Sequence, residues 1–198
     1  MKREGIVQEL ALLAREKQVE IADEILEEIV NISVFRIVPK GDIIRHIGDD
    51  THSMALILDG SIRTFYIDGD GNDITRGFCF RGSTCMDEGL FGYEESICEY
   101  ETLEECTLMI FSVEIIKKII MQNPQLEHAY VKLLERAMRY KIYRENSFLT
   151  ENATARYLHF KKMYPNISDT VALRHIATYL GIAPESLSRI RKSLKEKC

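Results

Sequence analysis

The sequence predicts an α+β fold in which a compact antiparallel β-roll is followed by helices that end in a helix-turn-helix. Three observations support this prediction. From about Ser33 to Ser112, short β-rich runs alternate with turn residues at intervals of about 8–12 residues. After Ser112 the glycines disappear until Gly181, and apolar residues recur with helical spacing. From Leu173 onward, apolar and small residues follow the helix-turn-helix pattern.

The composition is that of an ordinary globular chain. Its 198 residues, 45% of them hydrophobic and 29% charged, suffice for one large or two small domains with buried cores. No run approaches the roughly 18 apolar residues of a membrane span, so we expect a cytoplasmic protein without a membrane partner. The cysteines are odd in number and lack zinc-type spacing, which predicts mostly buried thiols, no bound metal and no cofactor. They are Cys79, Cys85, Cys98, Cys106 and Cys198.

The charge is divided unevenly along the chain. The net charge is −5, but residues 1–112 carry 10 Lys and Arg against 23 Asp and Glu, whereas residues 151–198 carry 9 against 4. A basic segment of this kind suits a polyanion, because Lys and Arg contacts to phosphates release counterions. The alternative is a solvated basic helix face, and charge alone leaves both interpretations open.

The first predicted element is a short amphipathic helix over residues 21–30, whose apolar residues form one stripe opposite acidic residues. The β-rich runs follow, and short turns rich in Gly, Pro and Asp separate them. This spacing predicts an antiparallel barrel or double-layer roll instead of a parallel sheet with crossover helices. The runs are VFRIV, IIRH, MALIL, SIRTFYI, DITRGFCF and TLMIF.

A long helix is predicted from Gln125 to Phe148. Its apolar stripe advances in alternating steps of four and three residues, a spacing that suits a partner helix. The alternative is that the stripe packs on the chain's own barrel. A further helix is predicted over residues 151–163, which the following Tyr-Pro-Asn break ends. The stripe consists of Leu126, Tyr130, Leu133, Ala137 and Tyr140.

The helix-turn-helix pattern begins at Leu173 and fits at seven positions. A small Ala177 lets the two helices approach closely, and Gly181 can adopt the positive φ of the turn. Pro184 suits the first turn of the second helix, where its missing N–H costs nothing. The apolar positions that complete the pattern are Ile176, Leu180, Ile182, Leu187 and Ile190.

The second helix of this motif is predicted from Glu185 to about Leu194. With its apolar residues inward, it presents side chains that can accept a hydrogen bond from cytosine, bond a phosphate or donate two hydrogen bonds to guanine. The alternative is a helical hairpin with a merely basic outer face. The outward residues are Glu185, Ser186, Ser188, Arg189 and Lys192.

Four segments together resemble the Crp/Fnr family of bacterial transcription regulators: LILDGSIRTFYIDGDGNDITRGFCFRGSTCMDEGLFG, NPQLEHAYVKLLERAMRYKIYRENSF, TARYLHFKKMYP and IATYLGIAPESLSRIRKSL. The resemblance implies a cyclic-nucleotide-binding-like effector domain over 1–112, a dimerisation helix and linker over 113–148, and a helix-turn-helix domain over 149–198. It implies a winged-helix-like head whose wing is truncated, because the sequence ends at Cys198. It further implies a parallel homodimer, joined along the stripe of the long helix, on a palindromic DNA operator, with RNA polymerase as a candidate partner.

The resemblance also implies roles for single residues. Glu185 and Arg189 would be the main base readers, with Ser188 nearby. The position before Pro184 is usually Ser or Thr in the family, but here it is Ala183, which cannot cap the helix and costs about 1 kcal/mol. The target sequence is therefore not transferred from relatives. The phosphate contacts would be Arg174, Ser186 and Lys192.

The effector site implied by the resemblance departs from the cyclic-nucleotide pattern. Asp87 stands for the ribose-binding acid, but the phosphate-binding pair falls on Ile97 and Cys98. An apolar Ile cannot pair a phosphate anion, and burying that anion without a charged partner is expensive. We therefore predict a small-molecule or redox signal other than cyclic AMP, with Cys85 and Cys98 as the candidate thiols. The effector-pocket residues are Cys85, Met86, Asp87, Glu88, Ile97, Cys98 and Lys141.

Two other classes of function stay open beside an effector-controlled regulator. A cupin-like metal-dependent enzyme would need two or three His with a carboxylate. Only His46 and His52 lie in the β-rich region and no H-x-H pair occurs, so we predict that the chain is not an enzyme. The other alternative is a constitutive DNA-binding repressor without an effector.

Overall fold

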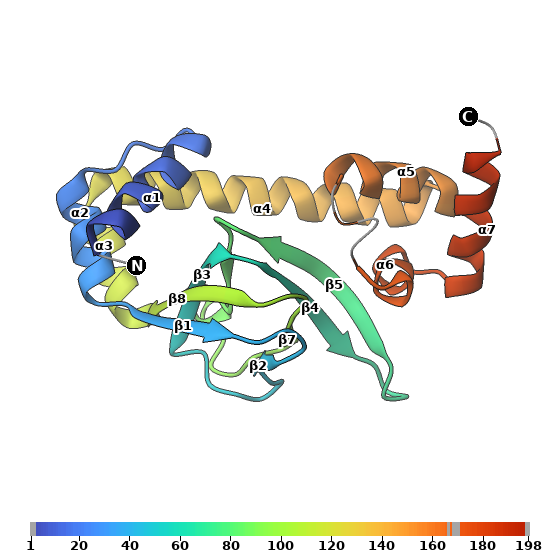
Figure 1. Ribbon diagram of the computed structural model, residues 1–198, viewed down its shortest axis with the longest axis horizontal. Helices are drawn as coiled ribbons and strands as arrows, with labels where there is room; N and C mark the ends of the chain where they lie inside the picture. The colour runs from blue at the N-terminus through green and yellow to red at the C-terminus, as the bar shows by residue number, and fades with distance from the viewer. Residues whose placement is uncertain (1–2, 166, 168–170, 197–198) are drawn as a thin grey trace. The chain divides into compact units, whose positions relative to one another are not determined.

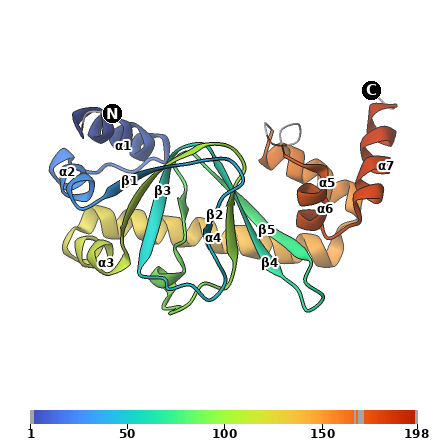
Figure 2. The same cartoon turned by 60° about the horizontal axis from the view of Figure 1, so that its bottom comes forward.

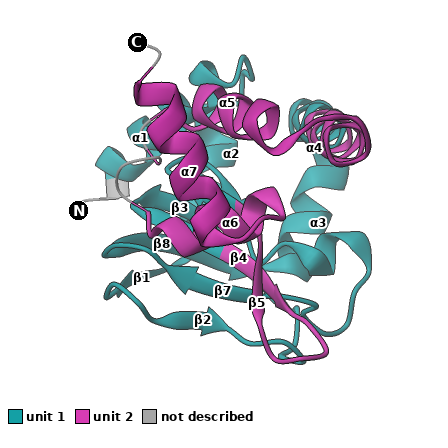
Figure 3. Ribbon diagram, turned by 90° about the vertical axis from the view of Figure 1, so that its right-hand side faces the viewer, with its two compact units in different colours: residues 1–63, 78–135 teal, residues 64–77, 136–198 magenta. Residues whose placement is uncertain are grey.

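The computed structural model describes residues 3–165, 167 and 171–196 (Figure 1). The described residues fall into two compact units, coloured in Figure 3. Unit 1 comprises residues 1–63 and 78–135, and unit 2 comprises residues 64–77 and 136–198. Cys198, one of the predicted thiols, lies outside the described residues.

Eight strands form two four-stranded sheets, with strand orders β1-β8-β3-β6 and β2-β7-β4-β5. Strand β8 pairs antiparallel with both β1 and β3, and β2 pairs antiparallel with β7. The predicted antiparallel roll is confirmed. The strands are β1 Val34–Val38, β2 Ile43–Arg45, β3 Ser53–Asp59, β4 Ser61–Ile67, β5 Asp73–Phe80, β6 Thr84–Cys85, β7 Glu99–Thr102 and β8 Cys106–Ser112.

Unit 1 has two hydrophobic cores. The first lies where the helices of this unit pack beside β3 and β8, as the grouping of α1, α2 and α3 in Figure 2 shows, and it includes Leu10, Leu26, Met109 and Ile116. The second contains the inward residues of the strands, such as Ile57, Ile62 and Leu108. The helices are α1 Arg3–Glu16, α2 Asp23–Asn31, the short 3-10 helix η1 Glu88–Phe91, α3 Val113–Gln122 and the start of α4 Pro124–Thr150.

Unit 2 contains the β4–β5 hairpin, the second half of α4, and α5 Ala153–Met163, α6 Leu173–Leu180 and α7 Pro184–Lys195. The Oδ1 of Asn152 accepts a hydrogen bond from the backbone N of Ala155 and caps α5, which therefore begins two residues later than predicted. Gly181 ends α6 with φ +66°, and Pro184 opens α7. Both features of the predicted helix-turn-helix are confirmed, and α7 has no side-chain cap at Ala183.

The individually predicted segments do not include α1, β6, η1, β7 or α3. The apolar residues of α1 include Ile6, Leu10 and Leu13 at helical spacing, but charged residues stand between them and obscure the pattern. In β7, the sequence EYET buries Tyr100 and Thr102 while the two glutamates stay half-buried. Glutamate is a poor strand former, so tertiary packing decides this strand.

Candidate nucleic-acid interface and effector site

Helix α7 presents a polar face because its apolar residues face the core of unit 2. Leu187 is fully buried, and Ile190 and Leu194 are half-buried. The predicted readers Glu185 and Arg189 are exposed on successive turns of the helix. Of the other predicted DNA contacts, Ser188, Lys192 and the α6 residue Arg174 are exposed, and Ser186 is half-buried.

A basic hollow of about 640 Å³ lies along α7 and the start of α6. Its lining includes the predicted residues Ser188 and Lys192, together with Arg191 and Lys195. Its lining also contains one carboxylate, Glu196, so the three cations leave a net positive charge, which suits a phosphate. Sequence reasoning did not select Arg191 and Lys195. Arg191 follows Ser188 by three residues and Lys195 follows Arg191 by four, so all three lie along one row of the helix. This spacing is the signal that could have indicated them.

Two arginines fix α6, and therefore the turn that leads to α7. The Nε of Arg156 donates to the backbone O of Leu180 at 3.1 Å, and a terminal nitrogen of Arg144 donates to the backbone O of Tyr179 at 3.0 Å. These carbonyls belong to the last turn of α6, where a helix leaves its carbonyl groups without intrahelical partners. Arg144 also stacks over the ring of Tyr179 at 3.8 Å and lies 4.6 Å from the ring centre of Phe148.

The residues of the predicted interface stripe on α4 differ in how deeply they are buried. Leu126 is buried in the first core of unit 1, so its side chain packs on its own chain. Tyr130 and Leu133 are half-buried and Ala137 is exposed. The hydroxyl of Tyr140 lies 3.0 Å from that of Tyr179 in unit 2.

A second apolar row of α4 is exposed. It advances in steps of seven, four and seven residues, as a helix face does. We call this row the α4 seam. It lies one to two positions away from the predicted stripe, and its residues are Val131, Met138, Ile142 and Leu149.

The effector segment of unit 1 centres on a buried ion pair. Arg45 and Glu88 are both almost fully buried, and their charged atoms are 3.8 Å apart. Arg45 also donates to the backbone O of Met86 at 2.9 Å, and to the backbone O and Oγ of Ser53 at 2.7 and 2.9 Å. The Oε1 of Glu88 accepts from Ser96 Oγ at 3.0 Å and from the Cys98 thiol at 3.2 Å. Groups of the roll itself therefore bind the Arg45 guanidinium and the Oε1 of Glu88, whereas the buried Oε2 of Glu88 has Arg45 nearby at 3.8 Å but accepts no hydrogen bond from the described residues.

The remaining predicted effector residues lie in different surroundings. Asp87 is half-buried and accepts from Thr84 Oγ1 at 3.2 Å. Burial raises the pKa of Tyr130 on α4, and the nearby Asp87 charge raises it further. Ile97 is 40% exposed. Lys141 is exposed and belongs to unit 2.

Two residues that were not predicted for the effector segment, Arg45 and Tyr130, lie at or near it. An arginine between the apolar residues of IIRH is the signal that could have indicated Arg45, because a buried guanidinium needs a carboxylate or carbonyl partner. Tyr130 was assigned to the helix stripe alone, and the influence of Asp87 on its pKa depends on the fold.

A second buried arginine in the roll is also paired. The Nε and one terminal nitrogen of Arg63 lie 2.9 and 2.8 Å from Glu101 Oε2. Within the described ranges, Arg45 and Arg63 are the buried cations of unit 1, and each faces a carboxylate.

The two candidate thiols lie in the interior of the roll. Cys85 and Cys98 are buried, as predicted. Burial raises the pKa of the Cys85 thiol well above its usual range, and nearby negative charge adds to the shift. The Cys98 thiol donates to a carboxylate. Reactive thiols of low pKa lie beside cations or helix N-termini, whereas burial is the main influence on the pKa of the Cys85 thiol.

In the part of the chain that the structure describes, no group of three or more His, Cys, Asp or Glu side chains is arranged to hold a metal ion. His46 instead pairs with Glu99, with 2.9 Å between Nδ1 and Oε2. None of the described helices is both long and apolar enough to span a bilayer.

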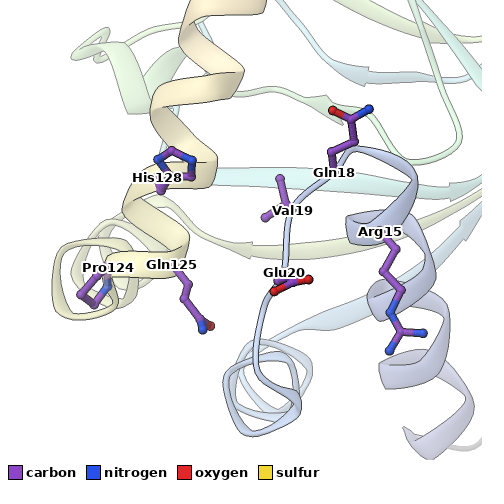
Figure 4. A pocket seen from close by; sticks show the side chains of 7 residues that line it. All are labelled: Arg15, Gln18, Val19, Glu20, Pro124, Gln125 and His128. Carbon is purple, nitrogen blue, oxygen red and sulfur yellow. The ribbon is translucent and has the colours of Figure 1, made fainter.

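A further hollow of about 640 Å³ lies between the α1–α2 connection and the start of α4 (Figure 4). Its charged side chains, Arg15, Glu20 and His128, are all exposed. Gln125 on its rim accepts a hydrogen bond from the backbone N of Ala22 at 3.1 Å. This mixed, exposed lining indicates no ligand class, and none of the predicted site residues belongs to it.

Comparisons with known proteins agree with this geometry. Residues 35–123 match the family model of the cyclic nucleotide-binding domain. The c-di-GMP-responsive global regulator CLP from Xanthomonas campestris is 16% identical, with 89% of this chain and 93% of that chain covered at a TM-score of 0.75. FixK2 from Bradyrhizobium japonicum is 15% identical over 84% and 86% of the two chains, at a TM-score of 0.74.

A protein from Eubacterium rectale assigned to the Crp/Fnr family of transcriptional regulators is 18% identical, covering 89% of this chain and 85% of that chain at a TM-score of 0.66. A comparison with curated proteins gave no match. At these identities structural likeness establishes the fold. Residues 35–123 therefore match the cyclic nucleotide-binding domain, and the chain has the fold of these three solved structures.

Proposed function

We propose that this chain is a homodimeric, sequence-specific DNA-binding transcription regulator whose roll receives a small-molecule signal. The observation that supports DNA binding best is the exposed polar face of α7 beside a basic hollow, on a helix-turn-helix closed by Gly181. A helix of this kind fits the major groove with its outward side chains at the base edges.

Each outward side chain has a proposed role. Glu185 accepts a hydrogen bond from a cytosine amino group, and Arg189 donates two hydrogen bonds to a guanine. Ser188 lies between them on the same face. The proposed phosphate contacts are Arg174, Ser186 and Lys192, to which the basic hollow adds Arg191 and Lys195.

The proposed dimer is a parallel pair of α4 helices. The α4 seam is exposed and apolar in the single chain, and a second copy of α4 would cover it. Two heads related by a two-fold axis would read half-sites about 34 Å apart, one helical turn of DNA.

The proposed effector is an uncharged or cationic small molecule, not cyclic AMP. A cyclic phosphate in this segment would lie near Asp87 and Glu88, while Arg45 and Arg63 already face carboxylates. The position expected to bind phosphate is Ile97, which has no charge and is partly exposed. The burial of Cys85 and Cys98, together with the raised pKa of the Cys85 thiol, favours a small molecule over a thiol-based redox signal.

Selection of bound DNA from a random double-stranded library tests the proposed function. We expect a palindromic consensus whose half-sites are about 10 base pairs apart, centre to centre. The matched control is the Glu185→Ala, Arg189→Ala double variant, which keeps the basic hollow and should enrich no consensus. Recovery of unrelated sequences by the unaltered chain would refute sequence-specific binding.

One observation favours a second candidate, a repressor that needs no effector. The charged interior of the roll, Arg45 with Glu88 and Arg63 with Glu101, is paired within the chain. If operator affinity is the same before and after addition of a small-molecule extract of the source cells, this candidate is favoured. A change in affinity favours the effector-controlled regulator.

A further inference from the structure

The β4–β5 hairpin, residues 64–77, groups with the helix-turn-helix in unit 2, although its strands belong to a sheet of the roll. Figure 3 shows the hairpin in the colour of α5, α6 and α7. Strand β5 stands last in the order β2-β7-β4-β5. One edge of an end strand presents backbone groups that the sheet itself does not pair, and proteins commonly cover such edges.

Thr178 on α6 covers this edge at Thr75. The backbone N of Thr75 donates to Thr178 Oγ1 at 3.2 Å, and the two Oγ1 atoms lie 2.9 Å apart. Thr75 is 2% exposed, so water cannot readily replace the Thr178 hydroxyl. The pair therefore joins the hairpin to the first helix of the DNA-binding motif.

The neighbouring residue of α6 makes a second junction. The hydroxyl of Tyr179 lies 3.0 Å from that of Tyr140 on α4. A Cβ added to Gly77 of the hairpin would lie 4.0 Å from the Tyr140 hydroxyl, which places Tyr140 directly against the strand. Tyr179 itself is buried among Phe160 and Tyr164. Helix α6 is therefore in contact with both the hairpin, through Thr178, and α4, through Tyr179.

We propose that Thr178 is a positioning residue for DNA reading, and that the Thr75–Thr178 pair is a latch through which the β4–β5 hairpin sets the orientation of α6 and α7. The latch leaves Glu185, Arg189 and Lys192 exposed, so it does not cover the proposed reading face. A head held in one orientation loses less conformational freedom on binding, which raises affinity.

This inference rests on the proposed DNA-binding function, and its test separates the two. The variant is Thr178→Val, which keeps the shape of the side chain and removes the hydroxyl. The conservative variant is Thr178→Ser, which keeps the hydroxyl. The matched control is Thr154→Val on the exposed side of α5. Amide hydrogen exchange of the full-length protein measures the latch, and affinity for the selected operator measures its effect.

In Thr178→Val we expect the Thr75 amide to exchange roughly tenfold faster and operator affinity to fall on the order of fivefold, the typical net effect of one hydrogen bond. Thr178→Ser and Thr154→Val should match the unaltered protein in both measurements. Thr75→Val, which alters the latch from the hairpin side, should weaken operator binding similarly and serves if Thr178→Val does not fold.

Three outcomes are distinguishable. An unchanged exchange rate of the Thr75 amide in Thr178→Val would overturn the latch. Faster exchange with unchanged or tighter operator binding would overturn its positioning role. If the unaltered protein selects no operator, the proposed function fails, and with it the positioning role, whereas the exchange result still decides whether the latch exists.

Discussion

The proposed readers Glu185 and Arg189 lie one helical turn apart on α7, and Lys192 lies beside the basic hollow. Base contacts determine sequence preference, whereas phosphate contacts supply affinity for any sequence. We therefore expect Arg189→Ala to relax the preference at one base position of each half-site and to cost about 1–3 kcal/mol of specific binding. Lys192→Ala should weaken operator and random DNA alike. Titration of both variants against both DNAs measures this, and equal losses for Arg189→Ala on the two DNAs would exclude its reading role.

The buried pair of Arg45 and Glu88 gives a prediction on stability. Arg45→Leu leaves a buried carboxylate without its cation, and it leaves Met86 O and Ser53 O without a donor. Breaking one partner of a buried pair typically costs about 3–5 kcal/mol, and urea unfolding should show a loss of this size. The Arg45→Leu, Glu88→Leu double variant should lose less than the single variant. A larger loss in the double variant would contradict the pairing.

The role of a single residue could be predicted from the sequence when it depends on neighbours within a few positions, and could not when it depends on a partner far away along the chain. The exposed residues of α7 followed from helical periodicity, because the buried Leu187 and half-buried Ile190 fix the opposite face within a few residues. Arg45 and Thr178 could not be found in this way. Their partners lie 43 and 103 positions away, respectively, and only the folded chain brings them together.

At the level of elements, the turn between α6 and α7 depends on Gly181. Its φ of +66° is a left-handed conformation that costs other residues roughly 1–2 kcal/mol, and an added Cβ would lie 2.8 Å from Phe148 Cε1. Gly181→Ala should therefore destabilise the helix-turn-helix by more than the backbone cost alone. Gly92→Ala is the matched control, because Gly92 has φ +86° and open space around its Cβ position. Thermal unfolding should show the larger loss for Gly181→Ala, and equal losses would rule out the steric contribution of Phe148.

Helix α4 allows the predicted stripe and the α4 seam to be distinguished. Ile142 is 59% exposed on the seam, whereas Ala137 is exposed on the stripe. If the seam joins two copies, Ile142→Lys buries a charge in the interface and should raise the dimer dissociation constant by roughly tenfold or more. Ala137→Lys should have a smaller effect. Sedimentation equilibrium measures both constants, and the opposite ranking would place the interface on the stripe.

Element prediction succeeded where one face of an element is plainly apolar. The predicted runs MALIL and TLMIF lie within β3 and β8, whose inward residues contribute to both cores of unit 1. It failed for β7, because the two glutamates of EYET are poor strand formers, although Tyr100 and Thr102 between them are buried. The α4 seam also escaped notice, since α4 has apolar residues on two rows and periodicity cannot say which row packs on the chain itself.

On the scale of the whole molecule, the uneven charge of the sequence coincides with a division of structure. The basic residues 151–198 contribute α5, α6 and α7, and the acidic residues 1–112 contribute the strands and both buried ion pairs. Composition could predict this separation because charge is a property of segments. It could not predict that the hairpin of the acidic part groups with the basic part, which depends on contacts such as Thr75 with Thr178.

The charge of the roll also gives a prediction on ligand selectivity. Residues 35–123 match a cyclic nucleotide-binding domain, yet the buried arginines face Glu88 and Glu101, and Ile97 occupies the position expected to hold the phosphate. A buried phosphate needs a charged partner, so binding would require breaking one of these ion pairs at a cost of several kcal/mol. Calorimetry with cyclic AMP and with cyclic GMP should therefore detect no micromolar binding by the full-length protein. Micromolar binding of either nucleotide would show that an arginine leaves its carboxylate for the ligand, and the Arg45→Leu and Arg63→Leu variants would then identify which one.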